Sequence, residues 1–597
     1  MGGYTIYRCG TPYNAVELAS LGYTQSFDTM YLAHLDHPPT KATRQSHYDW
    51  SFTQVSFGPL LEAPDNVAAV ATIANTDASN SGNAYFPQSA AYVVSAVNEE
   101  TGQESRASTS SSAYNDLGLK RNYTTITWDA VEDATYYRVF KSMTGAAYGY
   151  IGETTETSFR DDNITADLSD APIVAANPFD GTGNYPSVVC FFEQRLLWGK
   201  SRNAPNAIWG SRSADFENMD KARPVKADDA LAIACASGKV NAVAQLVPAK
   251  NLLALTSDSI FVVRGSNDDY LSPSPPPKVM RQNGRGASSL GGLLIDDVTF
   301  FQPSIGSEVR TLGFSFDIDG YQSNDVSVYS PDFFTGFRIV DWCYAGEPLS
   351  VIWAARDDGK LLAFTWQQEQ QVWGWTEMDV DGFVTSVCSV PEDGEDRVYL
   401  IVKRTIQGED LYYVERLASS KWTDFKDACY LDCAVSYSLD APQSAFGRLD
   451  HLEGREVWAL ADGFTVKGLT VNGGMVHLPD AASKVTIGLP VVATVETMPL
   501  NFDMQDGPST GSVAATGRAH LRLVDSLGVT AGRTVGKQEA IVTRLGEPVG
   551  VQANLFSGVA RVQMEQAVSF ETTVVIQQSN PLPMRLTACY LEAKSDR

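Results

Sequence analysis

Short runs of β-branched and aromatic residues recur along the whole 597-residue chain, each bounded by Gly, Pro, Asn or Asp. Such residues pack well on the pleated, half-buried surface of a strand, so the pattern predicts a mainly β protein. The best runs are 91–97, 125–128, 137–140, 259–263, 349–354, 361–366 and 397–402. Helical periodicity is nearly absent, and 15–21 is the best short candidate for a helix.

Asp-Gly dipeptides mark the second half of the chain, at 358–359, 381–382, 393–394 and 462–463. Both residue types tolerate the positive φ angles that two-residue hairpin turns require. We therefore expect antiparallel meanders with these dipeptides at their corners.

Changes in composition predict four regions. Residues 1–64 are rich in aromatic residues and form the first part of a β body. Residues 65–172 are rich in Ala, Ser, Thr and Asn, and their strand spacing predicts an inserted immunoglobulin-like β-sandwich with Trp128 as its core anchor. From 173 to 490 a hairpin recurs roughly every 20–25 residues, which indicates a propeller-like body. Residues 491–597 form a C-terminal β region, with strands expected at 541–544 and 574–576.

Charge limits the partners. The chain carries 45 Lys and Arg against 71 Asp and Glu, a formal net charge of −26 at pH 7. Proteins that grip nucleic acid neutralise its phosphates with basic patches, and no run of Lys and Arg occurs here. We therefore expect that the protein does not bind DNA tightly, and repulsion of DNA is left open.

Membrane and secretion signals are not evident either. No stretch approaches the ~20 apolar residues of a membrane helix, and the first residues lack the basic and apolar regions of a secretory signal. The eight Cys are scattered and do not indicate a disulfide scaffold. The expectation is a soluble product of a reducing cytoplasm without stable membrane insertion.

Several motifs match the residue pattern of a catalytic signature but lack the structural context that the chemistry needs. Gly507-Pro-Ser509-Thr-Gly511 matches a nucleophile elbow, but Asp506 and Pro508 favour a turn where a strand is needed. The segment 532–538 is one residue short of a phosphate-binding loop, and 284–286 follows a proline-rich loop instead of a strand. The 71 acidic residues suggest no specific carboxylate pair for glycoside hydrolysis. We expect no catalytic residue and no cofactor.

Candidate metal ligands also favour structural roles. His34 and His37 flank Asp36 within one turn, but no second ligand pair has matching spacing. Cys429 and Cys433 lack a partner pair as well. The Asp-rich segments 317–320 and 379–382 do not fit the spacing of a calcium loop and favour hairpin turns. We expect no metal site. A bound metal ion is the less favoured alternative for each of these groups of residues.

The most informative stretch runs from Gly183 to Asn218 and predicts a buried strand, a polar loop and a second strand with a Gly-Ser corner. Arg195 lies in the otherwise apolar first strand. A buried guanidinium needs compensation, so we expect a structural ion pair with Asp215 or Glu217.

This stretch resembles the tail nozzle proteins of short-tailed bacteriophages, also called tail tubular protein B. The family pattern is matched at Gln194-Arg195-Leu196, at Ile208-Trp209-Gly210-Ser211 and at Asp215 to Asn218. Upstream, Gln25 to Leu32, including Asp28, with His34, and the strand 50–58 fit in the same order. Downstream, the ordered matches reach about residue 490 and include Arg281, Gln282, Arg310, Trp353, Asp358, Gly359, Glu415, Arg416, 461–463 and 487–490.

The resemblance implies a non-enzymatic structural virion protein, in which these residues determine the fold. It implies a ring of identical subunits, expected to be a hexamer, at the distal end of a short tail. The ring would hang below the tail adaptor protein, carry tail fibres, spikes or a needle, and let genomic DNA pass through its lumen without specific binding. The location would be the virion tail, after assembly in the host cytoplasm.

Two departures from the family matter. Related chains carry a further segment before the region matched by 4–13, so we expect another chain to supply a missing blade or a different element to replace it. Only some members of the family carry a module like 65–172, so the resemblance implies no role for this module.

Two other classes of function stay open. One is a glycan-binding or glycan-degrading receptor module of a phage tail, suggested by exposed-looking aromatic residues such as Tyr148 and Tyr150. The other is a host-encoded adhesin of similar β content, which the ordered motif series disfavours.

Overall fold

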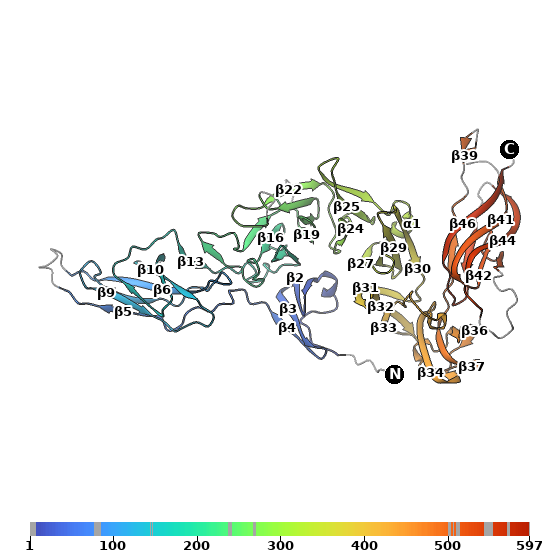
Figure 1. Ribbon diagram of the computed structural model, residues 1–597, viewed down its shortest axis with the longest axis horizontal. Helices are drawn as coiled ribbons and strands as arrows, with labels where there is room; N and C mark the ends of the chain where they lie inside the picture. The colour runs from blue at the N-terminus through green and yellow to red at the C-terminus, as the bar shows by residue number, and fades with distance from the viewer. Residues whose placement is uncertain are drawn as a thin grey trace. The chain divides into compact units, whose positions relative to one another are not determined.

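Antiparallel strands are the main secondary structure of the chain in the computed structural model (Figure 1). It describes residues 7–76, 85–143, 145, 147–236, 241–266, 270–499, 503–504, 507–508, 514–541, 553–569 and 573–595. The strands gather into many small sheets, so the prediction of a mainly β protein is confirmed. Within these residues no helix is long and apolar enough to cross a membrane. Two compact units divide the chain, Met1–Tyr329 and Ser330–Arg597, and each is described by itself.

The first unit contains four-stranded meanders in which each strand pairs with its neighbour in sequence or with the next strand after a short excursion. The sheets are β1 (Gly22–Ser26), β2 (Thr29–His34), β3 (His37–Ser46) and β4 (Asp49–Gln54); β14 (Val188–Phe192), β15 (Arg195–Gly199), β16 (Ala207–Gly210) and β18 (Leu231–Ala234); β19 (Val243–Pro248), β20 (Leu252–Thr256), β21 (Ile260–Arg264) and β22 (Lys278–Asn283); and β23 (Leu293–Ile295), β24 (Val298–Phe301), β25 (Arg310–Ser315) and β26 (Gly320–Asp325).

The first strands of these meanders lie beside one another in chain order, β1 against β14, β14 against β19 and β19 against β23. Apolar side chains fill the space between neighbouring sheets. Leu197 and Ile208 pack with Leu252 and Phe261 between the second and third meanders, and all four are buried. Trp198 packs on the opposite face of its sheet with Phe57. Alternate residues of one strand therefore serve two different cores, because successive side chains point to opposite faces.

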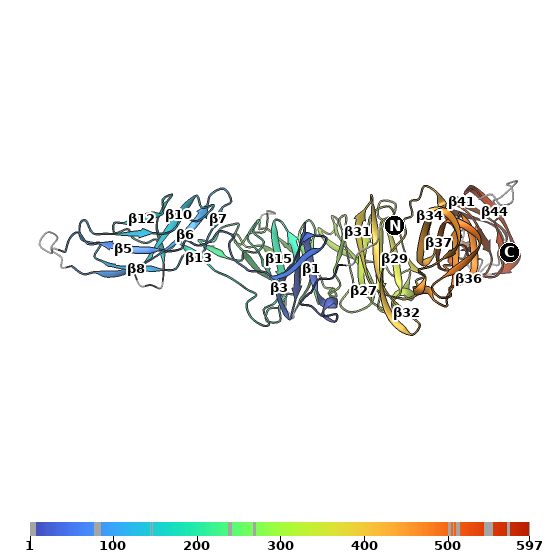
Figure 2. The same cartoon turned by 90° about the horizontal axis from the view of Figure 1, so that it is seen from below.

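The 65–172 segment forms two sheets that enclose one core (light blue to cyan, at the left of Figure 2). One sheet is β5 (Ala68–Thr72), β9 (Tyr123–Thr127) and β12 (Ser158–Asp161); the other is β6 (Gln88–Asn98), β7 (Gln103–Glu104), β8 (Ser111–Asn115), β10 (Tyr136–Ser142) and β11 (Gly149–Thr154). Trp128 is buried between them and meets the Tyr137 ring edge-on, with centroids 5.3 Å apart. A two-stranded sheet of β13 (Ala171–Val174) and β17 (Lys221–Arg223) follows.

The second unit begins with the short helix α1 (Pro331–Phe334) and continues as antiparallel sheets. These are β27 (Ile339–Ala345), β28 (Val351–Arg356), β29 (Leu361–Gln367) and β30 (Val372–Met378); the three-stranded β31 (Phe383–Glu392), β32 (Glu395–Ile406) and β33 (Glu409–Arg416); and β34 (Asp432–Phe446), β35 (Glu456–Ala461), β36 (Phe464–Thr470) and β37 (Val476–Leu489), in the spatial order β34-β37-β35-β36.

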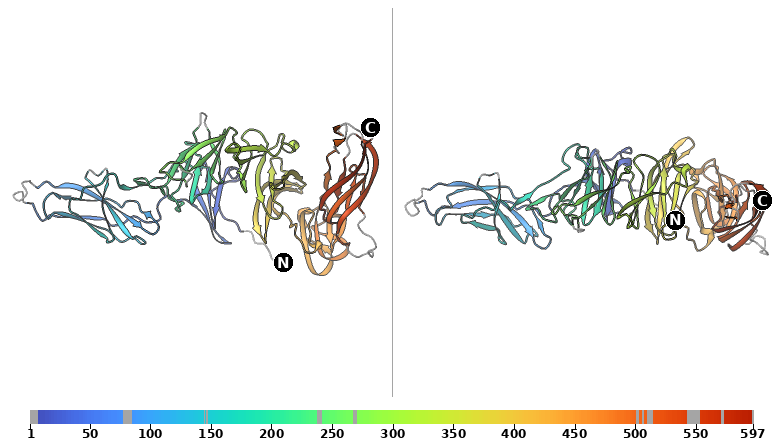
Figure 3. Two further views of the ribbon diagram at one scale, coloured as in Figure 1. Left: turned by 45° about the horizontal axis from the view of Figure 1, so that its top comes forward. Right: turned by 90° about the horizontal axis from the view of Figure 1, so that it is seen from above.

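The C-terminal strands form separate sheets (red in Figure 3). One has the order β38 (Ala493–Glu496), β45 (Val575–Gln578), β42 (Val529–Gly532) and β43 (Gln538–Ala540); another places β41 (Ala514–Ser526) between β44 (Phe556–Ser569) and β46 (Leu586–Ser595); β39 (Asp503–Met504) pairs with β40 (Gly507–Pro508). The expected strand at 574–576 corresponds to β45. Of the one expected at 541–544, residues 542–544 lie outside the described residues. The predicted domain boundaries stay predictions.

The turns agree with the sequence except at one place. Asp393-Gly394 and Asp462-Gly463 each form a two-residue hairpin turn with both φ angles positive, and 358–359 lies in the β28–β29 hairpin. The prediction for Asp381-Gly382 is wrong, because this dipeptide links β30 to β31 of the next sheet. The predicted helix at 15–21 is only a 3₁₀ turn, Glu17–Ser20.

Substitution of Gly394 by Ala tests the left-handed turn. Gly394 has a φ of +75°, a conformation that costs residues with a Cβ about 1–2 kcal/mol. We expect Gly394→Ala to lower the free energy of unfolding by about 1 kcal/mol in urea denaturation. The matched control is Gly374→Ala in β30, where an added Cβ would also meet no heavy atom within 4 Å but the φ is not in the left-handed region. Equal losses in both variants would contradict the turn.

Candidate functional site

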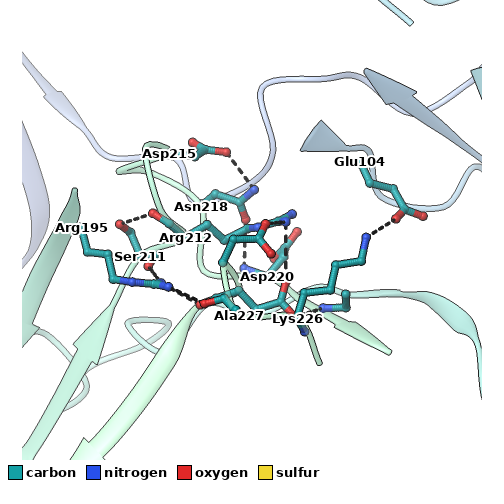
Figure 4. A network of polar contacts seen from close by, with 12 residues as sticks. Glu104, Arg195, Ser211, Arg212, Asp215, Asn218, Asp220, Lys226 and Ala227 are labelled. Atoms are coloured by element: carbon teal, nitrogen blue, oxygen red, sulfur yellow. Dashed lines mark hydrogen bonds and ion pairs between the residues drawn. The ribbon is translucent and has the colours of Figure 1, made fainter. Parts of the chain in front are cut away.

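We call the residues that carry the family resemblance the signature residues. Arg195 lies at the centre of them, in the stretch from Gly183 to Asn218, and is only 1% exposed. Its Nη1 donates to the carbonyl oxygens of Ser211 at 2.6 Å and Asp229 at 2.7 Å. Its Nη2 donates to the Ala227 carbonyl at 2.9 Å, and its Nε to that of Leu271 at 3.2 Å. Figure 4 shows the guanidinium of Arg195 directed toward Ser211 and Ala227. One side chain thus holds the β15 hairpin, the β16 corner and two loops together.

The predicted carboxylate partners of Arg195 are wrong. Asp215 accepts a hydrogen bond from Asn218 at 3.0 Å, and Glu217 pairs with Lys41 at 2.7 Å. Carbonyl oxygens carry no full charge, so burial lowers the pKa of Arg195 from its ordinary value, although the nearby acids oppose this shift. Burial likewise raises the pKa of Asp215.

The neighbouring signature residues fix the backbone around Arg195. Gln194 lies in the two-residue β14–β15 turn with a φ of 61°, and its carbonyl accepts from the Ala214 amide at 2.8 Å. The Ser211 hydroxyl is buried and accepts from the Leu196 amide at 3.0 Å. A Cβ on Gly210 would lie 2.9 Å from a methyl carbon of Leu197, so this position favours Gly.

Near Arg195, a second arginine, Arg212, forms ion pairs with two carboxylates. It is buried, and its Nη2 lies 2.5 Å from Asp228 and 3.6 Å from Asp229. Asp229 in turn accepts from the amides of Ala222 at 3.0 Å and Lys226 at 2.8 Å. Burial alone would raise the pKa of Asp228, but the Arg212 hydrogen bond and charge outweigh it and hold this pKa below its usual value.

The same network reaches into the 65–172 module (Figure 4). Asp220 is fully buried and accepts from Arg106 Nε at 2.7 Å and Nη2 at 2.8 Å. Glu104 lies 4.0 Å from Lys226 and 3.0 Å from Arg138 within the module. The hydrogen bond to Asp220 raises the pKa of Arg106. Ion pairs therefore tie the module to the loop that follows β16. No sequence pattern predicts this pairing, since Arg106 and Asp220 are far apart in the chain.

Signature residues at the start of the chain act locally. Gln25 Nε2 donates to the Phe27 carbonyl at 2.8 Å across the β1–β2 turn. Asp28 pairs with Arg44 of β3 at 2.7 Å. Both contacts stabilise one end of the first meander.

Further along the first unit, Arg281 and Gln282 lie in β22, where Arg281 is exposed and Gln282 is half-buried. Arg310 donates to the Ser323 hydroxyl at 2.9 Å and to its carbonyl at 3.1 Å, across β25 and β26. Trp209 is half-buried, with its ring 5.4 Å from that of Phe179.

In the second unit, Arg356 donates to both oxygens of Asp358 at 2.7 Å. This hydrogen bond lowers the pKa of Asp358. Gly359 has a φ of +85°, and an added Cβ would lie 2.5 Å from the Phe383 ring. Trp353 packs half-buried against the core between the β27–β30 and β31–β33 sheets.

Glu415 and Arg416 belong to β33. Glu415 accepts two hydrogen bonds from the buried Arg404, at 2.6 and 2.7 Å, and Arg416 lies 3.3 Å from Glu392. Arg404 also forms an ion pair with Asp432 and donates a hydrogen bond to the Asp381 carbonyl. The Asp381-Gly382 link therefore serves as an acceptor for a buried cation.

The candidate metal ligands have other partners. His34 is buried with its Nε2 3.0 Å from the Ser20 hydroxyl, and burial lowers its pKa. His37 lies 3.1 Å from Glu17, and Asp36 pairs with Arg202 at 2.5 Å. Over the described residues, no three His, Cys, Asp or Glu side chains are grouped to hold a metal ion.

The remaining motifs are turns or lie outside the described residues. Residues 532–538 form the corner between β42 and β43, and 284–286 lies in the loop after β22. Residues 509–511 of the elbow-like motif lie outside the described residues. Cys429 and Cys433 are free, half-buried thiols, and burial raises the pKa of both. Tyr148 and Tyr150 are half-buried, not exposed, and the Arg138 guanidinium lies 5.0 Å from the centre of the Tyr150 ring.

No protein-family model and no curated protein matches the chain. Among solved structures, the chain is similar to one described as the crystal structure of RRP9 WD40 repeats, with 10% sequence identity. The alignment covers 63% of this chain and 84% of that chain, with a TM-score of 0.27. A similarity at this level supports no conclusion about fold or function.

Substitution of Arg195 tests the carbonyl cluster. Lysine keeps the charge but cannot reach four carbonyls in a fork, and each hydrogen bond to a charged group is worth about 1.5–3 kcal/mol. We expect Arg195→Lys to lower the free energy of unfolding by about 3 kcal/mol in urea denaturation. The control is Arg202→Lys, which affects a half-exposed ion pair with Asp36 and should cost under about 0.5 kcal/mol. Equal losses would contradict the cluster.

The Arg356–Asp358 pair predicts a dependence of stability on pH. The folded-state pKa of Asp358 lies below its unfolded value of about 4, so the pair stabilises the fold above that pH. This stabilisation is lost as the pH falls through the folded-state pKa. We expect the stability difference between the parent and Asp358→Asn to shrink between pH 7 and pH 3.

The control repeats the Asp358→Asn substitution in an Arg356→Met background, where the difference should be small at every pH. A difference that stays constant from pH 7 to pH 3, or that survives in the Arg356→Met background, would contradict the pairing.

Proposed function

We propose that this chain is a non-enzymatic structural virion protein, a subunit of the ring-shaped tail nozzle of a short-tailed bacteriophage. It would form the DNA exit channel below the tail adaptor and a platform for fibres, spikes or a needle. The support is the ordered series of family motifs from about residue 23 to 490, together with the roles of those residues in the structure.

The observation that carries the proposal is the way in which the signature residues are used. Arg195 binds loop carbonyls, Asp358 binds Arg356, and Glu415 binds Arg404. Each of these contacts holds a meander to its own turns or to the next segment. A motif series built from such contacts indicates a shared fold, and the step from that fold to a nozzle function is made by the resemblance to the family.

The meanders support the finer part of the proposal. Four-stranded antiparallel sheets with their first strands side by side are the local arrangement of propeller blades, and a two-sheet module with a buried Trp between its sheets is typical of immunoglobulin-like domains. We propose a propeller-like body with an inserted immunoglobulin-like module at 65–172, assembled into a hexameric ring.

In this proposal the net charge of −26 helps DNA to pass through the channel. DNA carries one negative charge per ~1.7 Å of its axis, so an acidic channel wall repels phosphates and lets the duplex slide. We propose that Asp and Glu outnumber Lys and Arg on the inner wall of the ring. The alternative is an acidic outer surface that keeps the particle soluble.

Electron microscopy tests the proposal directly. We expect rings of the purified protein with an axial channel, and antibody labelling at the tip of the tail of the virions that carry it. A map at side-chain resolution should show the acidic inner wall. A stable monomer in virions, or a basic channel wall, would contradict the proposal.

A glycan-binding or glycan-degrading receptor module is the second candidate. It is favoured by a cavity of about 360 Å³ between β31–β33 and β34–β37, lined by Phe383, Lys403, His451 and Arg455 among others. Phe383 offers a ring and the cations offer donors to a sugar. Incubation with the host surface polysaccharide separates the two functions, because a conduit releases no fragments and retains no glycan.

A further inference from the structure

The hairpin of β25 and β26 ends in an apolar tip that lies in solvent. Phe316 is 91% exposed and Ile318 is 61% exposed in the turn between these strands. The ring of Phe314 meets Phe316 edge-on with centroids 5.2 Å apart, which orients the tip. Asp317 and Asp319 alternate with these residues, and neither has an ion-pair partner within the described part of the chain. We call residues 316–319 the knob.

An apolar hollow lies elsewhere in the same unit, beside β16 and β18. It has a volume of about 340 Å³, and its lining includes Met219, Ala230 and Leu231, all buried. Trp209 also lines the hollow, and Lys221 is its one charged lining residue. In the described residues Lys221 has no ion-pair partner. We call this hollow the socket.

The knob and the socket are complementary in size. A cavity of about 150 Å³ in another protein accepts a benzene molecule, so a hollow of 340 Å³ has room for the Phe316 ring and an aliphatic neighbour. Trp209 gives the socket an aromatic lining residue, and a pair of aromatic rings is worth about 0.5–1.5 kcal/mol beyond buried area.

They are also complementary in charge. The knob carries the carboxylates of Asp317 and Asp319, and the socket carries the ammonium group of Lys221. Unpaired charges of opposite sign at the rim of an apolar contact fix its register and suppress wrong partners. In its own chain the knob stays exposed, so it does not occupy the socket of the same copy.

We infer that the knob of one copy of this chain inserts into the socket of the next copy. Two different patches on one chain form a heterologous contact, which closes into a ring when the rotation per subunit divides a full turn. The inference rests on the proposed ring and identifies the contact that closes it. Phe316 is its central anchor, with Asp317 and Asp319 facing Lys221.

Substitution of the anchor tests the contact. We expect Phe316→Ala to weaken self-association about 30-fold in analytical ultracentrifugation, the size of an interface hot spot. The control is Phe27→Ala, which removes an equally exposed aromatic ring from the β1–β2 turn and should leave self-association unchanged. Both residues lie in solvent in the single chain, so neither substitution should impair folding.

Charge reversal tests the pairing. Lys221→Glu alone and the double substitution Asp317→Lys with Asp319→Lys should each weaken association. A mixture of these two variants should form a contact only where a reversed knob meets a reversed socket, and a single chain carrying all three substitutions should recover ring formation. No recovery in the triple variant would overturn the charge pairing.

Cross-linking tests which patches meet. In a background with the exposed Cys9 and Cys388 replaced by Ser, one chain carries Ile318→Cys and another carries Ala232→Cys, at the socket. Mixing them under oxidising conditions should yield a covalent dimer and no larger product. A chain carrying both Cys should yield a ladder that ends at the ring.

The results separate this inference from the proposed function. Rings that persist in Phe316→Ala, with no cross-link between the two sites, would overturn the knob-and-socket contact and leave the nozzle proposal standing. A parent chain that forms no ring in the virion would overturn the nozzle proposal.

Discussion

A buried guanidinium surrounded by backbone carbonyls is the interaction on which the first unit depends. Removal of a charge from water costs several kcal/mol, and Arg195 recovers that cost through four hydrogen bonds to loop carbonyls. These carbonyls lie outside the strands, in the corner after β16 and in two loops, where no sheet partner is available. The arginine therefore satisfies groups that small meanders leave unpaired, and it joins the loop before β18 to a distant loop before β22.

The second unit uses the same chemistry with carboxylates added. Arg404 binds Glu415, Asp432 and the Asp381 carbonyl, and Arg356 binds Asp358 and the Phe333 carbonyl. Each of these arginines is buried or nearly so and connects strands to an adjoining loop. The repeated solution suits a fold made of small sheets, because each sheet has a limited core of its own and needs contacts that cross to the next segment.

The ion pairs of Asp220 and Glu104 extend this network to the 65–172 module. Arg106 grips the fully buried Asp220 with two hydrogen bonds, which makes the junction directional as well as strong. A module attached only by its two chain connections would rotate freely, whereas this pair restrains it. Restraint of this kind fits a module that presents a surface in a fixed direction on a larger particle.

Most strands and most turn types followed from residue patterns, because alternation and the positive-φ tolerance of Asp-Gly are local properties. The strand at 397–402, the Asp393-Gly394 turn and the buried Trp128 were all predictable in this way. The role of Asp381-Gly382 was not, since the same dipeptide can also link two sheets, and here neither residue has a positive φ. What only the tertiary structure decided was the set of partners: carbonyls in place of carboxylates around Arg195, Arg106 against Asp220, and a solvent-exposed knob at 316–319. Carbonyl groups have no sequence signal, and long-range pairs form only after the chain has folded.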